Sequence, residues 1–146
     1  MATPSQLQTL IELAERESDQ AAKRLGAATR AVADGQQKLT MLHGYRDDYL
    51  QKLIARGNDG MSPLAYQNFM AFLQKLENAI TGQQDVIKMA ERKVDQERNS
   101  WQEAERKRMS YQTLQKRSNL QLMQKLAKQD QKAMDEHAAR QAYYKR

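Results

Sequence analysis

Apolar residues in the first 56 positions recur at alternating intervals of three and four. Of the fourteen positions in this frame, only Ser18, Gly35 and Arg46 are not apolar. A heptad seam of this kind predicts a long α-helix with a narrow apolar stripe, which a partner helix must cover. The apolar positions of this first frame are Leu7, Ile11, Ala14, Ala21, Leu25, Ala28, Val32, Leu39, Leu42, Tyr49 and Leu53.

The same spacing returns after residue 63. This second frame also has fourteen positions, and its exceptions are Gln83, Glu97 and Arg108. Because the two seams have equal length, they predict an all-α fold, a long antiparallel two-helix coiled-coil hairpin. The apolar positions of the second frame are Tyr66, Phe69, Leu73, Leu76, Ile80, Ile87, Ala90, Val94, Trp101, Ala104 and Tyr111.

Between the two seams lies a segment rich in turn-forming residues, GNDGMSP at 57–63. Glycine and asparagine accept positive φ, and proline is favoured as the first residue of a helix. We therefore predict a turn at 57–63, with Gly57 just past the end of the first helix and Ser62 as the N-cap of the second.

The chain is predicted to form a single coiled-coil domain, residues 1–146, with helices at about 5–56 and 63–142. A turn at Asp34-Gly35 would instead divide the first helix and produce three helices. The heptad phase continues unchanged across that glycine, and this continuity favours an unbroken helix.

The register of the hairpin can be examined through the single tryptophan. Folding the chain about the turn places opposite each other residues whose numbers sum to about 115 or 122. In either register Trp101 faces an alanine, Ala14 or Ala21. A bulky indole opposite a small side chain fills a seam without a void, so both registers are compatible with good packing.

The second predicted helix is longer than the first, so its C-terminal end overhangs. Residues 116–146 contain eight Lys or Arg and three Asp or Glu, which concentrates the net charge of +6 at this end. We expect a basic helix end that is either a docking surface or a frayed tail. Its new apolar set, which lacks an intramolecular partner, is Leu120, Met123, Ala127 and Met134.

Side chains that commonly carry catalysis or bind metals are scarce. Cysteine is absent, and the two histidines, His43 and His137, are far apart in any hairpin. We therefore expect no catalytic, cofactor-binding or metal site. The sequence also has no apolar run of membrane-spanning length and no signal peptide, which predicts a cytoplasmic protein.

One group of residues near the turn widens the apolar stripe. Tyr45, Phe72 and Ala79 occupy g positions, which are normally charged in coiled coils. The group is predicted either to bind a partner along one side of the coil or to thicken the seam. We call it the flank patch, and its residues are Leu42, Tyr45, Tyr49, Phe72, Leu76, Ala79 and Gln83.

At these residues the chain resembles the FliJ family of flagellar type III export proteins. The resemblance is colinear over nearly the whole sequence, and its spaced aromatic residues are not a matter of composition. The stretches that carry it are LTMLHGYRDDYL (39–50), YQNFMAFLQKLENAI (66–80), SWQEAERKRMSYQTLQKR (100–117) and DQKAMDEHAAR (130–140).

The resemblance implies a cytoplasmic component of the flagellar export apparatus, peripherally associated with the cytoplasmic face of the membrane, and a fold similar to the stalk of rotary ATPases. Family members have no catalysis of their own. They promote assembly of the export ATPase FliI hexamer, contact the export gate protein FlhA and escort filament-type export chaperones. No small-molecule substrate and no nucleic acid are implied.

The family's gate-binding surface corresponds to the flank patch. This chain departs from the family at two positions on the edge of this surface: Lys38, beside the patch, stands where members carry glutamine, and Gln83, within the patch, where they carry histidine.

Three other functions are compatible with the sequence. The equivalent stalk protein of a virulence type III secretion system would share the architecture and differ in its partners. A basic coiled coil could bind nucleic acid weakly through phosphate contacts, although no base-reading element is present. A structural coiled coil could also pair two copies through the g-position aromatic residues.

Overall fold

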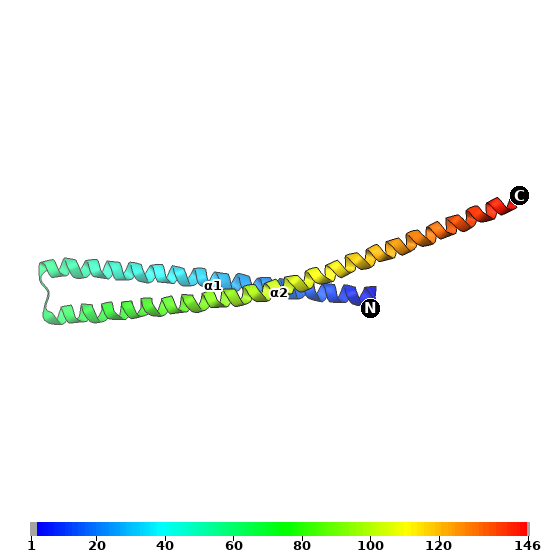
Figure 1. Cartoon of the computed structure of the whole chain (residues 1–146). Coiled ribbons are helices and arrows are strands. Elements are labelled where there is room, and N and C mark those ends of the chain that lie inside the picture. Colours follow the sequence, from blue (N-terminus) through cyan, green and yellow to red (C-terminus); the bar gives the residue numbers. More distant parts are fainter. Residues whose placement is uncertain (1–2, 146) are drawn as a thin grey trace. The chain divides into compact units, whose positions relative to one another are not determined.

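The computed structural model describes residues 3–145 of the 146-residue chain. Two helices, α1 (Pro4–Asp59) and α2 (Pro63–Tyr144), run antiparallel as a hairpin (Figure 1). The predicted all-α two-helix hairpin is therefore confirmed, and residues 3–145 contain no strand. None of the helices in this range has an apolar stretch long enough to cross a membrane.

Side-chain caps mark the start of both helices. The Oγ1 atom of Thr3 accepts a hydrogen bond from the backbone N–H of Gln6 at 3.2 Å, and the Oε1 atom of Gln6 accepts one from the N–H of Thr3 at 2.9 Å. This reciprocal pair is a capping box. At α2, the Oγ atom of Ser62 accepts from the N–H of Ala65 at 3.1 Å, which confirms Ser62 as the N-cap ahead of Pro63.

The turn is shorter than the predicted segment. Helix α1 continues through Gly57 to Asp59, three residues beyond the expected end at residue 56. The residue with a left-handed backbone is Gly60, whose φ is 91°, and its N–H donates to the carbonyl of Gly57 at 3.3 Å. Gly60, and not Gly57, therefore terminates α1, because glycine takes positive φ without steric cost.

Helix α1 is unbroken at Gly35, so the three-helix alternative is wrong. The glycine has a packing role instead of a turn role. A Cβ atom at this position would lie 3.1 Å from Cγ1 of Ile87 on α2, closer than an ordinary van der Waals contact. Because Gly35 has no side chain, Ile87 can approach α1 closely. Gly35 is thus a packing position inside a continuous helix, which is why the heptad spacing is the same before and after it.

By its contacts the chain divides into two units, of which one is Gln20–Gln102. Here the two helices lie side by side (Figure 1), and ion pairs join them. Arg24 Nε lies 3.1 Å from Glu97 Oε2, and Arg46 Nη1 lies 3.7 Å from Glu77 Oε1. The residue numbers in these pairs sum to 121 and 123, so the helices adopt the register near 122 and not the one near 115.

This register places Trp101 opposite Ala21. Ala21 is 1% exposed, and Trp101 is partly buried. The combination of a large and a small residue agrees with the predicted packing of the indole. Other buried apolar residues of this unit are Ala28, Ile80 and Ile87.

The second unit combines residues 3–19 with residues 103–145. Gln115 donates a side-chain hydrogen bond to Gln8 at 3.0 Å, joining α2 to the start of α1. Every residue from 116 to 145 is exposed, which confirms the overhanging end of α2. The buried apolar residues of this unit are Leu7, Ile11 and Ala14.

Candidate protein-binding surfaces

The flank patch lies within the unit Gln20–Gln102 and takes residues from both helices. Its aromatic edge is open to solvent, because Tyr45 is 54% and Phe72 46% exposed. Ala79 is also exposed. The members that lie partly buried, and so also belong to the seam, are Leu42, Tyr49, Leu76 and Gln83.

Aromatic contacts connect the two helices at the patch. The ring of Tyr49 packs against Phe69 and Phe72 with centroid distances of 4.9 and 4.6 Å, both tilted. Tilted pairs at these distances stabilise by about 0.5 to 1.5 kcal/mol beyond the area they bury. The guanidinium of Arg56 lies 5.4 Å above the Phe69 ring. Tyr49 therefore thickens the seam and also holds Phe72 at the edge of the patch.

A shallow hollow of 210 Å³ opens at one end of the flank patch. Three patch residues line it, and two further lining residues come from α1, Lys38 and Met41. Met41 is 50% exposed. We call this the Lys38 hollow, and its full lining is Lys38, Met41, Leu42, Tyr45 and Gln83.

Neither Lys38 nor Met41 was predicted to belong to the flank patch. Lys38 occupies the same g position as Tyr45, seven residues earlier, but a charged residue is usual at this position, so the heptad pattern does not single it out. Met41 lies outside the a, d and g positions, and the seam frame contains no signal for it. Only the pairing of the helices places both beside Gln83.

Gln83 is tied to the facing helix. Its Nε2 atom donates a hydrogen bond to the carbonyl oxygen of Gly35 at 3.0 Å. Both residues are exceptions to the apolar seam, one in each helix, and this hydrogen bond joins them, although the residue directly opposite Gly35 is Ile87. A polar residue at a seam position specifies register at some cost in stability, and this hydrogen bond limits the cost.

Glu97 is another exception, and it is buried with 8% of its surface exposed. Lys93 Nζ lies 3.0 Å and Arg24 Nε 3.1 Å from its carboxylate. Hydrogen bonds from Lys93 and Arg24 lower the pKa of Glu97, while burial opposes the shift. The carboxylate is therefore ionised and paired, which suits a structural role.

Ser18, Glu105 and Arg108 form a third polar cluster, in the other unit. Arg108 donates to Glu105 from Nε at 3.0 Å and from Nη2 at 2.7 Å, and the hydroxyl of Ser18 donates to the same carboxylate. These hydrogen bonds, led by that of Arg108, lower the pKa of Glu105 from 4.5 to about 2. Two seam exceptions, Ser18 and Arg108, thus meet at one carboxylate.

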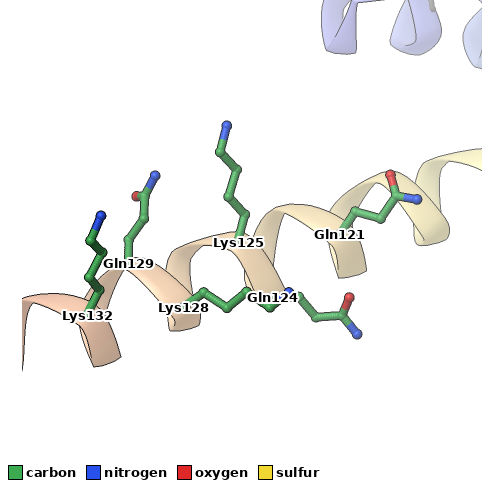
Figure 2. Close-up of a pocket in the computed structure, with 6 residues that line it drawn as sticks. All are labelled: Gln121, Gln124, Lys125, Lys128, Gln129 and Lys132. Carbon is green, nitrogen blue, oxygen red and sulfur yellow. The ribbon is translucent and has the colours of Figure 1, made fainter. Parts of the chain in front are cut away.

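The overhanging end of α2 presents a basic face (Figure 2). Lys125, Gln129 and Lys132 point to the same side of the helix in this view. The face surrounds a shallow open depression. Apolar side chains of the same segment are equally open to solvent, Met123 and Met134 among them. The six residues of the basic face are Gln121, Gln124, Lys125, Lys128, Gln129 and Lys132.

The sequence profile of the family described as "Flagellar FliJ protein" matches residues 3–146 of this chain. The chain is 35% identical over 145 residues to the Flagellar FliJ protein of Escherichia coli (strain K12), and this alignment covers 99% of each protein. It is 34% identical over 145 residues to the Flagellar FliJ protein of Salmonella typhi, with the same 99% coverage of both.

Proposed function

This chain belongs to the FliJ family of flagellar proteins, and on that premise we propose that it is a non-catalytic component of the flagellar protein export apparatus that acts by binding other proteins. Its two exposed surfaces, the flank patch and the basic face, support this function. Both relatives are flagellar proteins, which favours this system over a virulence secretion system.

In this proposal the flank patch contacts the export gate protein FlhA. The support is the exposure of Tyr45 and Phe72 on a scaffold that Tyr49 holds in place. Aromatic residues are enriched among the few side chains that dominate binding energy at protein interfaces. Half-exposed rings on a rigid helix pair suit such a contact because they lose little side-chain entropy on binding.

The overhanging end of α2 promotes assembly of the export ATPase FliI hexamer. Its residues 116–144 are helical and exposed and carry more lysine and arginine than aspartate and glutamate, as expected for a stalk that contacts a ring of subunits. The protein also escorts filament-type export chaperones, a role for which membership of the family is the support. It acts in the cytoplasm, at the cytoplasmic face of the membrane export apparatus.

The observation that carries the gate contact is the exposure of Tyr45 and Phe72, and their truncation tests it. Replacing both by alanine is expected to reduce binding to purified FlhA at least tenfold. Each ring is a candidate for a contribution of about 1 to 2 kcal/mol, and about 1.4 kcal/mol corresponds to tenfold in affinity. Binding is measured by titration calorimetry.

A matched control is Tyr143→Ala, because Tyr143 is an exposed aromatic residue outside the patch. This variant is expected to bind FlhA with unchanged affinity. If the double variant keeps full affinity while its helicity by circular dichroism is unchanged, the gate contact lies elsewhere.

A further inference from the structure

The overhanging end of α2 carries an apolar stripe as well as the basic face. At 3.6 residues per turn, the apolar residues of this stripe span about 160° of the helix circumference. All of them are exposed, with Leu126 at 50% and Met123 at 68%. We call them the overhang stripe, and they are Leu120, Leu122, Met123, Leu126, Ala127 and Met134.

The width of the overhang stripe distinguishes it from a coiled-coil seam. A single partner helix covers a narrow line of a and d positions, whereas Leu122 and Leu126 extend the stripe well to one side of Leu120. A broad apolar stripe opposite a polar, lysine-rich face is typical of helices that lie in the surface of a bilayer. A flat apolar surface therefore covers this stripe more fully than one helix does.

The polar side of the same segment is basic. Residues 116–134 contain five Lys or Arg and one acidic residue, Asp130. Lys125 and Lys132 point to the same side of the helix (Figure 2). None of the ion pairs among the described residues 3–145 includes a residue of 116–134, so these positive charges have no carboxylate partner in that range. Two copies of the segment repel each other, whereas a negatively charged surface attracts it.

A bilayer that contains anionic phospholipid is complementary to both sides of the segment. Its acyl-chain boundary accepts apolar side chains, and its headgroups attract lysine and arginine. Nucleic acid supplies the negative charge but no apolar surface for the stripe. The lysines lie across the helix from the stripe, about 10 Å away, which is close to the Debye length at low salt. Their attraction to the headgroups is therefore effective at low salt and weakens as salt is added.

We propose that residues 116–134 bind the surface of bilayers that contain anionic phospholipid, with the overhang stripe in the acyl-chain boundary and the lysines attracted by the headgroups. This inference goes beyond the proposed function, because it gives the overhanging end of α2 a ligand other than the export ATPase. Charge complementarity and the width of the stripe carry it.

Binding of the full-length protein to lipid vesicles tests the inference. The probe is a vesicle of phosphatidylglycerol mixed with phosphatidylcholine, and the comparison is a vesicle of phosphatidylcholine alone. Co-sedimentation at low salt is expected to show binding to the mixed vesicles that is tighter by about tenfold or more. The difference between the two vesicles is expected to shrink at high salt.

Three substitutions remove the basic face. Changing Lys125, Lys128 and Lys132 together to glutamate is expected to weaken binding to the mixed vesicles by about tenfold or more at low salt. The matched control makes the same change of net charge at exposed lysines outside the overhanging end and is expected to bind nearly as wild type. These control positions are Lys23, Lys52 and Lys75.

The overhang stripe is tested separately from the charge. Met123→Gln with Leu126→Gln is expected to weaken binding to the mixed vesicles about fivefold, and the loss should persist at high salt, where the attraction between charges is screened. The control is Leu13→Gln with Met89→Gln, which changes two apolar residues that are exposed outside the overhanging end. This control is expected to bind as wild type.

Asp130 provides a gain of binding. It lies within the arc of the overhang stripe, where its carboxylate is disfavoured by the acyl-chain boundary and repelled by anionic headgroups. Asp130→Asn is therefore expected to bind the mixed vesicles about two- to fivefold more tightly than wild type. Asp85→Asn removes the same charge from an exposed site elsewhere on α2 and is expected to have no such effect.

Several results would overturn the inference. Equal binding to both vesicles, or equal loss in the lysine variant and its control, would show that the basic face is not what the lipid attracts. Unchanged binding by Met123→Gln with Leu126→Gln would show that the stripe is not inserted. A dimer in light scattering that this pair of substitutions dissociates would assign the stripe to a second copy of the chain. Circular dichroism checks that every variant is folded.

Stimulation of FliI is measured separately, so the two ideas fail separately. If truncation after Gln115 abolishes stimulation while the full-length protein does not bind the mixed vesicles, the proposed function stands and this inference is wrong. If the full-length protein binds the vesicles as expected while truncation leaves stimulation intact, this inference stands and the action on the ATPase lies elsewhere.

Discussion

Gln83 Nε2 donates a hydrogen bond to the carbonyl oxygen of Gly35 at 3.0 Å, and so joins two positions, one on each helix, where the apolar seam is interrupted. The other exceptions also take part in polar contacts that join the two helices. Ser18 and Arg108 share Glu105, Glu97 pairs with Arg24 across the coil, and Arg46 pairs with Glu77. The interruptions of the pattern are therefore the contacts that align the helices. The six exceptions are Ser18, Gly35, Arg46, Gln83, Glu97 and Arg108.

The glycines of α1 are expected to differ in their response to alanine. A Cβ atom at Gly26 or Gly44 meets nothing within 4 Å, whereas one at Gly35 would lie 3.1 Å from Ile87 Cγ1. Gly26→Ala and Gly44→Ala are expected to raise the free energy of unfolding by about 0.5 to 1 kcal/mol each, because alanine has the higher helix propensity. Gly35→Ala is expected to be less stable than either variant. Urea denaturation of the three proteins checks this, and equal gains at all three positions would contradict it.

The turn depends on Gly60. A non-glycine residue at its φ of 91° is strained, and Gly60→Ala is expected to lower the free energy of unfolding by roughly 1 to 2 kcal/mol. The matched variant is Gly57→Ala, three residues earlier inside α1, where alanine is expected to stabilise. Thermal unfolding followed by circular dichroism measures both. A Gly60→Ala protein as stable as wild type would show that the turn adopts another conformation.

The pH dependence of stability is expected to report on Glu105. Its pKa in the folded protein is about 2, below the ordinary value of 4.5. The folded state therefore favours the ionised carboxylate, and its stabilising effect is present above pH 4.5 and declines as the pH falls toward about 2. The difference in Tm between wild type and Glu105→Gln should be largest near neutral pH and should narrow below pH 4.5. A difference that stays constant from pH 7 to pH 2.5 would contradict the pairing with Arg108.

The register near 122 predicts that Ala21 has no room for a larger side chain. Ala21→Leu is expected to destabilise by about 1 to 3 kcal/mol through overpacking at the position opposite Trp101. Ala22→Leu adds the same atoms at the exposed neighbouring position and is expected to be nearly neutral. Denaturation monitored by tryptophan fluorescence measures the free energy of unfolding of both variants. Equal stability of both variants would argue for a different register.

Truncation after Gln115 separates folding from the proposed action on the ATPase. Residues 116–145 are all exposed, so their removal is expected to leave the cooperative unfolding of the paired helices almost unchanged. Stimulation of FliI hexamer assembly, measured by ATPase activity against FliI concentration, is expected to be lost. The full-length Tyr45→Ala, Phe72→Ala protein serves as the control and should stimulate normally. Undiminished stimulation by the truncated protein would remove the overhanging end from the proposed function.

The helices, the hairpin and the overhanging end could all be predicted from the amino-acid sequence. These features follow from local rules: heptad spacing specifies a helix with one apolar stripe, Ser62 and Pro63 specify a helix start, and unequal helix lengths leave one end unpaired. The aromatic residues of the flank patch were also predictable, because apolar g positions depart from the usual coiled-coil pattern. The residue at which α1 ends could not be predicted, because Gly57 and Gly60 are equally suitable helix terminators by residue type.

The register and the composition of the Lys38 hollow, in contrast, depend on how the two helices pack against each other. Two registers that differ by seven residues present the same apolar pattern, since a heptad repeat is unchanged by a shift of one heptad. Polar contacts such as Arg24 to Glu97 and Arg46 to Glu77 remove this degeneracy, because an ion pair forms only when two particular residues lie close together. The same alignment brings Lys38 and Met41 beside Gln83, a neighbourhood that depends on both helices and that neither helix encodes alone.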